Sequence, residues 1–272
     1  MEHLFQLPPH LVALLCLGAS AGFFAGLIGI GGGFILVPGL QMVFSMQPEL
    51  AGKVMPVVLG TTTCCMIFTA TASARAQQAR AAVNVEAFKR LGLSMGGGAA
   101  IGAILATVIS TVAVKWAFGL FCLYSAAGFL FFRPTPGRDG WAVATGNAAL
   151  PGTFFGAICG LIGVGGTNLV VPYLMQRNVE LRTAVGTASA LQIPAALIGT
   201  AAYFLLGGGG LNAFGDVGYV RMPVVGVLAA AALLFAPLGV RAGHWLPVPA
   251  LRKVFGAFTG LVGLKMLGLL PL

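Results

Sequence analysis

The sequence predicts an all-α polytopic membrane protein built from two inverted repeats of about five apolar segments each. The first observation is composition: 58% of the 272 residues are hydrophobic and 8% are charged, whereas soluble domains carry about 25% charged residues. The second is a series of apolar runs long enough for membrane helices, without the alternating pattern of a membrane β-barrel. The third is a glycine-rich motif that occurs once in each half of the chain.

The motif spans Gly26–Pro38 (GLIGIGGGFILVP) and recurs, 134 residues later, at Gly160–Pro172 (GLIGVGGTNLVVP). Each glycine inside a plain helix costs about 1 kcal/mol relative to alanine. The clusters therefore predict glycine-broken helices or hairpins at 29–34 and 163–168. Matching interruptions in two halves of a membrane protein indicate a transporter binding site.

Ten apolar segments follow one another along the chain, and their spacing divides it into two transmembrane repeats, 1–132 and 142–272, joined by a polar linker at 133–141. The segments that follow the glycine clusters are short for a full span of ~20 residues, so they could tilt, re-enter or form half-helices. The segments cover 10–29, 33–46, 54–74, 90–111, 115–132, 143–163, 166–176, 183–206, 221–240 and 252–271.

The distribution of lysine and arginine favours an odd number of crossings, or a re-entrant hairpin, in each half. With that parity 11 cations lie on one side and 3 on the other, whereas four crossings per half divide the same residues 7 to 7. The positive-inside rule selects the first arrangement, which inverts the second half relative to the first. The larger group comprises Arg75, Arg80, Lys89, Arg90, Arg133, Arg138, Arg177, Arg182, Arg241, Arg252 and Lys253.

Several function classes are excluded by residue content. The net charge of +9 belongs to cations that flank apolar spans, so orientation in the membrane explains it better than nucleic acid does. The five cysteines lie in apolar spans without a CxxC pair and the three histidines are scattered, so we expect no metal and no cofactor. Walker and catalytic motifs are absent, so we expect no enzyme. No Asp or Glu falls clearly inside a span, which disfavours a carboxylate proton relay.

The glycine clusters are the first candidate binding residues. Each cluster precedes a new apolar run, and the free N–H groups at a helix start bind oxyanions. Close packing between helices is the alternative role of such small residues. The candidates are Gly31, Gly32 and Gly33 in the first copy and Gly165, Gly166, Thr167 and Asn168 in the second.

Polar residues in the third apolar segment of each half are the second set of candidates: Thr61 and Thr62, then Thr187, Ser189 and Gln192. They donate hydrogen bonds to an anion without adding charge, although Ser and Thr also bond to their own helix. Gln192 precedes Pro194, which frees a backbone carbonyl.

Two arginines near span ends are candidates for attracting an anion. Arg75 and Arg241 could draw the anion into an inward-open cavity, or they could snorkel to the cytoplasmic interface.

The paired glycine motifs, together with Gly60-Thr61, Ala184–Thr187 (AVGT) and Leu238–Ala242 (LGVRA), resemble the TauE/SafE family of membrane permeases, often called sulfite exporters. The resemblance covers roughly residues 12–270. It implies secondary transport, by alternating access around a midplane site, of sulfite, sulfoacetate or another organosulfonate, and export is the expected direction. A permease for carboxylates, a non-transporting membrane subunit and a membrane-embedded enzyme remain the alternatives.

The expected location is the bacterial inner membrane, as a multi-pass protein with an uncleaved first helix. The expected partners are a small anion and the lipid bilayer, and no nucleic acid. The direction of transport, the coupling ion and a homo-oligomeric state stay open at this stage.

The charge distribution predicts a cytoplasmic position for the loops around 75–90, 133–138 and 177–182. Single cysteines near Gln78, in a variant without native cysteines, should resist an impermeant thiol reagent added to intact cells and react after permeabilisation. Labelling from outside intact cells would reverse the topology.

Overall fold

The computed structural model describes residues 9–28, 32–47, 50, 52–78, 83–131, 148–210, 216–245 and 248–270. Within these residues the chain forms ten α-helices and one short antiparallel hairpin, in which Asp216 pairs with Arg221. The elements are α1 (Pro9–Ile28), α2 (Gly33–Ser45), α3 (Val54–Gln78), α4 (Val85–Val108), α5 (Thr111–Phe131), α6 (Ala149–Ile162), α7 (Thr167–Gln176), α8 (Leu181–Leu206), β1 (Asp216–Val217), β2 (Val220–Arg221), α9 (Met222–Trp245) and α10 (Val248–Met266).

The all-α membrane architecture is confirmed. Each predicted apolar segment overlaps one helix. Five helices of the described chain, α3, α4, α5, α8 and α9, contain stretches long and apolar enough to cross a membrane. Several helix ends differ from the prediction. For example, α4 begins before the apolar run because Asn84 caps it, accepting the Ala87 N–H at 2.9 Å, and because Glu86 stabilises the first turn.

Both glycine interruptions separate two helices that fold back on each other, which favours a hairpin over a broken helix; of the first cluster, residues 29–31 lie outside the described residues. In the first, Gly32 lies beside Ala21 and Gly39 beside Leu17, so α2 returns along α1. In the second, the rings of Phe155 and Tyr173 are 5.3 Å apart, so α7 returns along α6. At 13 and 10 residues, α2 and α7 are too short to span a bilayer at 1.5 Å per residue.

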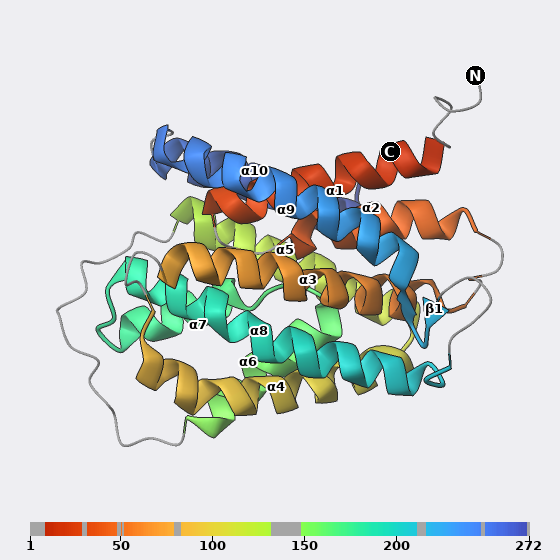
Figure 1. Cartoon of the computed structure of the whole chain (residues 1–272), viewed down its shortest axis with the longest axis horizontal. Helices are drawn as coiled ribbons and strands as arrows, with labels where there is room; N and C mark the ends of the chain where they lie inside the picture. The colour runs from red at the N-terminus through yellow and green to blue at the C-terminus, as the bar shows by residue number, and fades with distance from the viewer. Residues whose placement is uncertain are drawn as a thin grey trace.

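The two halves correspond helix by helix, α1 to α6, α2 to α7, α3 to α8, α4 to α9 and α5 to α10. The pairing of the helices stays the same when each helix is replaced by its counterpart. Helix α1 packs on α9, and its counterpart α6 packs on α4, the counterpart of α9. Helices α3 and α5 pack on their own counterparts, α8 and α10. In Figure 1, α1, α9 and α10 lie above α3, whereas α4, α6 and α8 lie below it.

The self-paired helices run antiparallel. Gly60 of α3 packs against Tyr203 of α8, and Thr63 packs against Gly199, so residue numbers rise in opposite directions along the pair. A two-fold rotation axis that exchanges two antiparallel helices must be perpendicular to both of them, because the rotation has to reverse the direction of each helix. The second half is therefore inverted relative to the first, as the charge distribution predicted. The exact repeat boundaries stay a prediction, because the linker 133–141 lies outside the described residues.

Glycines bring the cross-repeat helices into backbone contact. A Cβ on Gly156 of α6 would lie 2.0 Å from the Met95 carbonyl oxygen of α4, and a Cβ on Gly22 of α1 would lie 2.2 Å from the Ala232 oxygen of α9. Such close packing is typical of membrane helices that lack a hydrophobic driving force for association. Large apolar side chains such as Leu93, at 81% exposed, cover the outer surface, where lipid solvates them.

We expect Gly156→Ala to destabilise the protein by about 1–3 kcal/mol, because the added methyl group must push α6 away from α4. Gly97→Ala is the matched control: Gly97 lies on the facing helix α4, but a Cβ added there would meet nothing within 4 Å. The measurement is the thermal unfolding midpoint in detergent. Equal midpoints for the two variants would show that α4 and α6 are not in backbone contact.

Candidate functional site

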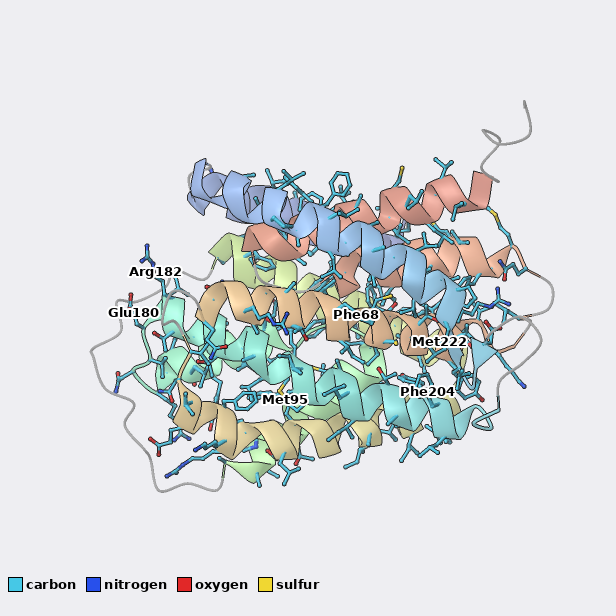
Figure 2. All side chains as sticks on the ribbon, in the orientation of Figure 1. Phe68, Met95, Glu180, Arg182, Phe204 and Met222 are labelled. Carbon is cyan, nitrogen blue, oxygen red and sulfur yellow. The ribbon has the colours of Figure 1, made fainter. Side chains whose placement is uncertain are left out.

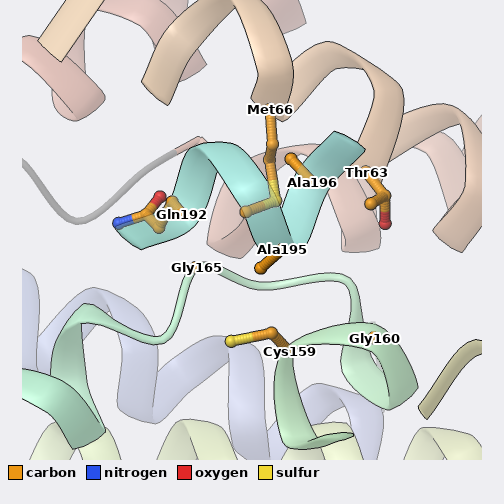
Figure 3. Close-up of a pocket in the computed structure, with 8 residues that line it drawn as sticks. All are labelled: Thr63, Met66, Cys159, Gly160, Gly165, Gln192, Ala195 and Ala196. Carbon is orange, nitrogen blue, oxygen red and sulfur yellow. The ribbon is translucent and has the colours of Figure 1, made fainter. Parts of the chain in front are cut away.

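A small cavity lies where the tip of the second hairpin meets α3 and α8 (Figure 3). The enclosed space is about large enough for one water molecule. Two polar side chains contribute to the lining, one from α3 and one from α8. The lining residues are Thr63, Met66, Cys159, Gly160, Gly165, Gln192, Ala195 and Ala196.

The glycines of the second hairpin tip create this cavity by turning the chain and leaving room. Gly163 ends α6 with a left-handed conformation, φ 65°, and its N–H bonds to the Cys159 carbonyl oxygen at 2.9 Å. Most other residues would be strained there. A Cβ on Gly165 would lie 2.4 Å from Gln192 Oε1, so glycine allows the Gln192 side chain to lie across the turn.

Gln192 reaches the first residue of α7. Its side chain is 2% exposed, and its amide Nε2 donates to Thr167 Oγ1. The N-cap residue of α7 is Gly166, which has no side chain to cap the helix, and the N–H groups of Leu169 and Val170 bond back to the Gly166 oxygen at 2.9 and 2.8 Å. The start of α7 carries the partial positive charge of a helix N-terminus. Asn168 adds a buried amide Nδ2 that has no hydrogen-bond partner among the described residues.

The first hairpin brings a second uncapped helix start to the same region. Helix α2 follows Gly32 without a capping side chain, and a Cβ on Gly33 would lie 2.6 Å from the Gly163 oxygen. The two tips therefore touch. Gly32, Gly33, Gly165 and Gly166 are all buried. Gly31, also predicted to bind, lies outside the described residues.

Thr61 and Thr187 do not share a site. Thr61 lies beside Gly60, which packs against Tyr203. Thr187 is therefore separated from it by about sixteen residues of α8, roughly 24 Å at 1.5 Å per residue. One small anion cannot contact both.

Each of these threonines instead accepts a hydrogen bond at the start of the fourth helix of a repeat, α9 or α4. Thr61 Oγ1 accepts the Arg221 N–H at 3.2 Å, immediately before α9. Thr187 Oγ1 accepts the Asn84 N–H at 2.8 Å, immediately before α4. The two contacts correspond under the exchange of the halves, which indicates a structural function for both hydroxyl groups.

The remaining predicted residues are scattered around this centre. Ser189 lies one turn from Gln192 and donates to the Val185 oxygen at 2.9 Å. Thr62 is fully buried, and its hydroxyl has no partner among the described residues. Arg75 is exposed at the end of α3, away from the cavity. The Arg241 side chain lies outside the described part of the structure.

Sequence reasoning missed the most connected cation. Arg221 pairs with Asp216 at 3.3 Å, donates to Gln47 Oε1 and lies 5.3 Å from the Phe44 ring centre. It thereby ties the β1–β2 hairpin to the end of α2. Its position before an apolar span suggested only an interfacial cation, since Gln47 and Phe44 are far away in the sequence. Cys159 and Met66 were also missed, because an apolar lining residue has no sequence signal.

No three His, Cys, Asp or Glu side chains gather into a metal-binding group in the described part of the chain. The arrangement offers amide, hydroxyl and backbone donors instead. Such donors suit an anion, and this assignment of binding residues stays a prediction.

The whole chain is similar to known membrane proteins. The family model for Sulfite exporter TauE/SafE matches residues 14–266. A probable membrane transporter protein of Haemophilus influenzae is 26% identical over 257 residues, covering 93% of this chain and 97% of the relative. One of Methanocaldococcus jannaschii is 24% identical over 274 residues, covering 98% and 97%. The Bacillus subtilis protein YunE, also a probable membrane transporter, is 29% identical over 183 residues, covering 60% and 67%. No solved structure matches significantly.

We expect Thr61→Val and Thr187→Val each to lower stability by roughly 1–3 kcal/mol, because a backbone N–H loses its partner. The control is Thr259→Val, since the Thr259 hydroxyl is equally buried but bonds only within its own helix, to Phe255 O at 2.7 Å. Unfolding midpoints with and without ligand measure the effect. A loss of ligand-induced stabilisation without a change in the ligand-free midpoint would instead make these threonines binding residues.

Proposed function

The chain belongs to the TauE/SafE family of membrane transporters, and we propose that it carries a small sulfur-containing oxyanion, sulfite or an organosulfonate, between its two inverted halves. The family and the relatives named as membrane transporters make it a transporter rather than an enzyme. The substrate, the direction and the binding residues are our proposal.

The observation that carries the proposal is the buried, uncapped start of α7 beside Gln192. The proposed donors are the Gln192 amide, which donates to Thr167 at the start of α7, and the buried amide of the next residue, Asn168. Thr167, which accepts from Gln192, keeps that amide at the helix start. A helix N-terminus with hydrogen-bond donors attracts negative charge. The absence of a fixed cation among the described lining residues suits release as well as binding.

Shape favours a sulfonate or sulfite over a carboxylate. The oxygens of a tetrahedral sulfonate or pyramidal sulfite accept hydrogen bonds from several directions at once, whereas a planar carboxylate accepts in one plane. Donors left without an acceptor in a buried site cost about 1–3 kcal/mol each. The three-dimensional set of donors around the α7 start therefore discriminates by shape, and a permease for carboxylates is the main alternative.

Transport requires the cavity to open to each side in turn. The two hairpin tips touch at Gly33 and Gly163, and α3 packs on α8, so the site lies between the halves. We propose that rocking of one half against the other exposes it alternately, as in other inverted-repeat transporters.

The cations support one orientation of the protein in the membrane. Figure 2 shows Glu180 and Arg182 at one end of the bundle and Met222 toward the other. We place the Arg182 end in the cytoplasm of a bacterial inner membrane, with export as the direction. Excess lysine and arginine at that end support this orientation.

The decisive experiment compares sulfonates with carboxylates on purified protein. We expect sulfite and sulfoacetate to bind at least tenfold more tightly than malonate, equivalent to ~1.4 kcal/mol, by calorimetry, and to be carried in proteoliposomes. Equal binding of sulfoacetate and malonate would favour the carboxylate permease. No flux of either class, despite a folded protein, would favour a non-transporting subunit.

Three variants assign this selectivity to the site. Gln192→Ala and Asn168→Ala should narrow the preference for sulfonates by removing donors. Gly165→Ala should act similarly, because its methyl group would displace the Gln192 amide. Gln176→Ala, an exposed glutamine at the end of α7, is the control and should bind like the unmodified protein. Unchanged selectivity in all three site variants would move the site elsewhere.

A further inference from the structure

Two fully or nearly fully buried threonines, one on each central helix, have hydroxyl groups without a hydrogen-bond partner among the described residues. Thr62 on α3 is 0% exposed and Thr200 on α8 is 3% exposed. Three other buried threonines on these helices, Thr63, Thr69 and Thr187, bond to their own backbone; Thr63 donates to the Leu59 oxygen at 2.7 Å. A free buried hydroxyl is costly, so a temporary partner would offset that cost.

The two hydroxyl groups occupy equivalent places relative to the cavity. Met66 of α3 and Ala196 of α8 line it, and Thr62 lies four residues before Met66 while Thr200 lies four residues after Ala196. Residues four apart lie on one face of a helix. Because α3 and α8 are antiparallel, with Gly60 against Tyr203, both steps lead toward the same end of the bundle.

That end is the one covered by the β1–β2 hairpin. A Cβ on Gly60 would lie 2.6 Å from the Tyr219 oxygen, and one on Gly207 would lie 2.3 Å from the Gly218 carbonyl carbon. Arg221, at the end of β2, donates its N–H to Thr61, the neighbour of Thr62. The buried hydroxyl groups therefore lie between the cavity and the cover.

We propose that Thr62 and Thr200 form a second binding station for the transported oxyanion, on the path between the central cavity and the end closed by the β1–β2 hairpin. This inference rests on the proposed function and extends it. As the substrate leaves Gln192 and Thr167, the two hydroxyl groups donate to its oxygens, one helical turn beyond Met66 on α3 and one turn beyond Ala196 on α8. They carry no charge, so they hold the anion weakly and pass it on.

The first test does not depend on the identity of the substrate. Thr62→Cys and Thr200→Cys are introduced separately into a chain without native cysteines, and a variant retaining only Cys122, which is fully buried in α5, is the control. A small anionic methanethiosulfonate added to proteoliposomes should modify positions 62 and 200 at least about tenfold faster than Cys122. Equal rates at all three positions would overturn the proposal.

The second test separates this station from the central site. In Thr62→Val and Thr200→Val, sulfite flux should fall at least about tenfold while the calorimetric Kd at the central site changes less than about twofold, and Thr→Ser should restore flux. Thr259→Val, which removes an equally buried hydroxyl on α10, should leave flux unchanged. Normal flux in both valine variants would overturn the station.

The two proposals fail in distinguishable ways. If the unmodified protein neither binds nor carries a sulfur oxyanion, the proposed function is wrong. The labelling rates then still decide whether positions 62 and 200 line an aqueous path, because the reagent reports access of a small anion. Fast labelling with no sulfite flux would therefore keep the path and discard the substrate.

Discussion

The constraint on which the structure depends is that the chain reverses direction twice inside an apolar bundle. Backbone groups in hydrocarbon need internal partners, so irregular backbone survives only where protein covers it. Here each turn is covered by the other, since Gly33 packs on the Gly163 carbonyl. The same turns leave the first N–H groups of α2 and α7 without capping side chains. The chemistry of the site and the stability of the turns are therefore consequences of one arrangement.

The glycines of α6 and of the turn after it have different functions in this arrangement. Close helix packing and an open turn therefore occur together in one segment. Gly156 and Gly160 allow α6 to touch the backbone of α4, since a Cβ added at either position would lie 2.0 or 2.1 Å from a carbonyl oxygen. Gly163 supplies the left-handed turn. Gly165 leaves space for Gln192. Because α6 is fixed against α4 by the first pair, the position of the turn and of the α7 start is fixed as well.

The sequence predicted what depends on local pattern and on duplication. Hydropathy located the ten helices, the repeated glycines located both interruptions, and the cation distribution indicated the inversion. It could not predict the register of α3 against α8, which separates Thr61 from Thr187. It could not show that Thr62 and Thr200 lack partners, because every other feature of these residues is shared with threonines that bond to their own helix. Arg221 was missed for a related reason: its contacts with Phe44 and Gln47 join segments more than 170 residues apart.

The fold is nearly symmetric, whereas the site is not. Alignment of Gly60-Thr61 with Gly186-Thr187 places Met66 opposite Gln192, and alignment of the glycine motifs places Phe34 opposite Asn168. The second half therefore contributes the amide donors, and the first contributes apolar side chains; Phe34, for instance, stacks on Phe121 with ring centres 6.0 Å apart. Alternating access needs two conformations that the repeat symmetry can exchange, but it does not need two binding sites. Under the proposed function, concentrating the donors in one half would let a single anion stay with Gln192 while the other, apolar half moves past it without breaking hydrogen bonds.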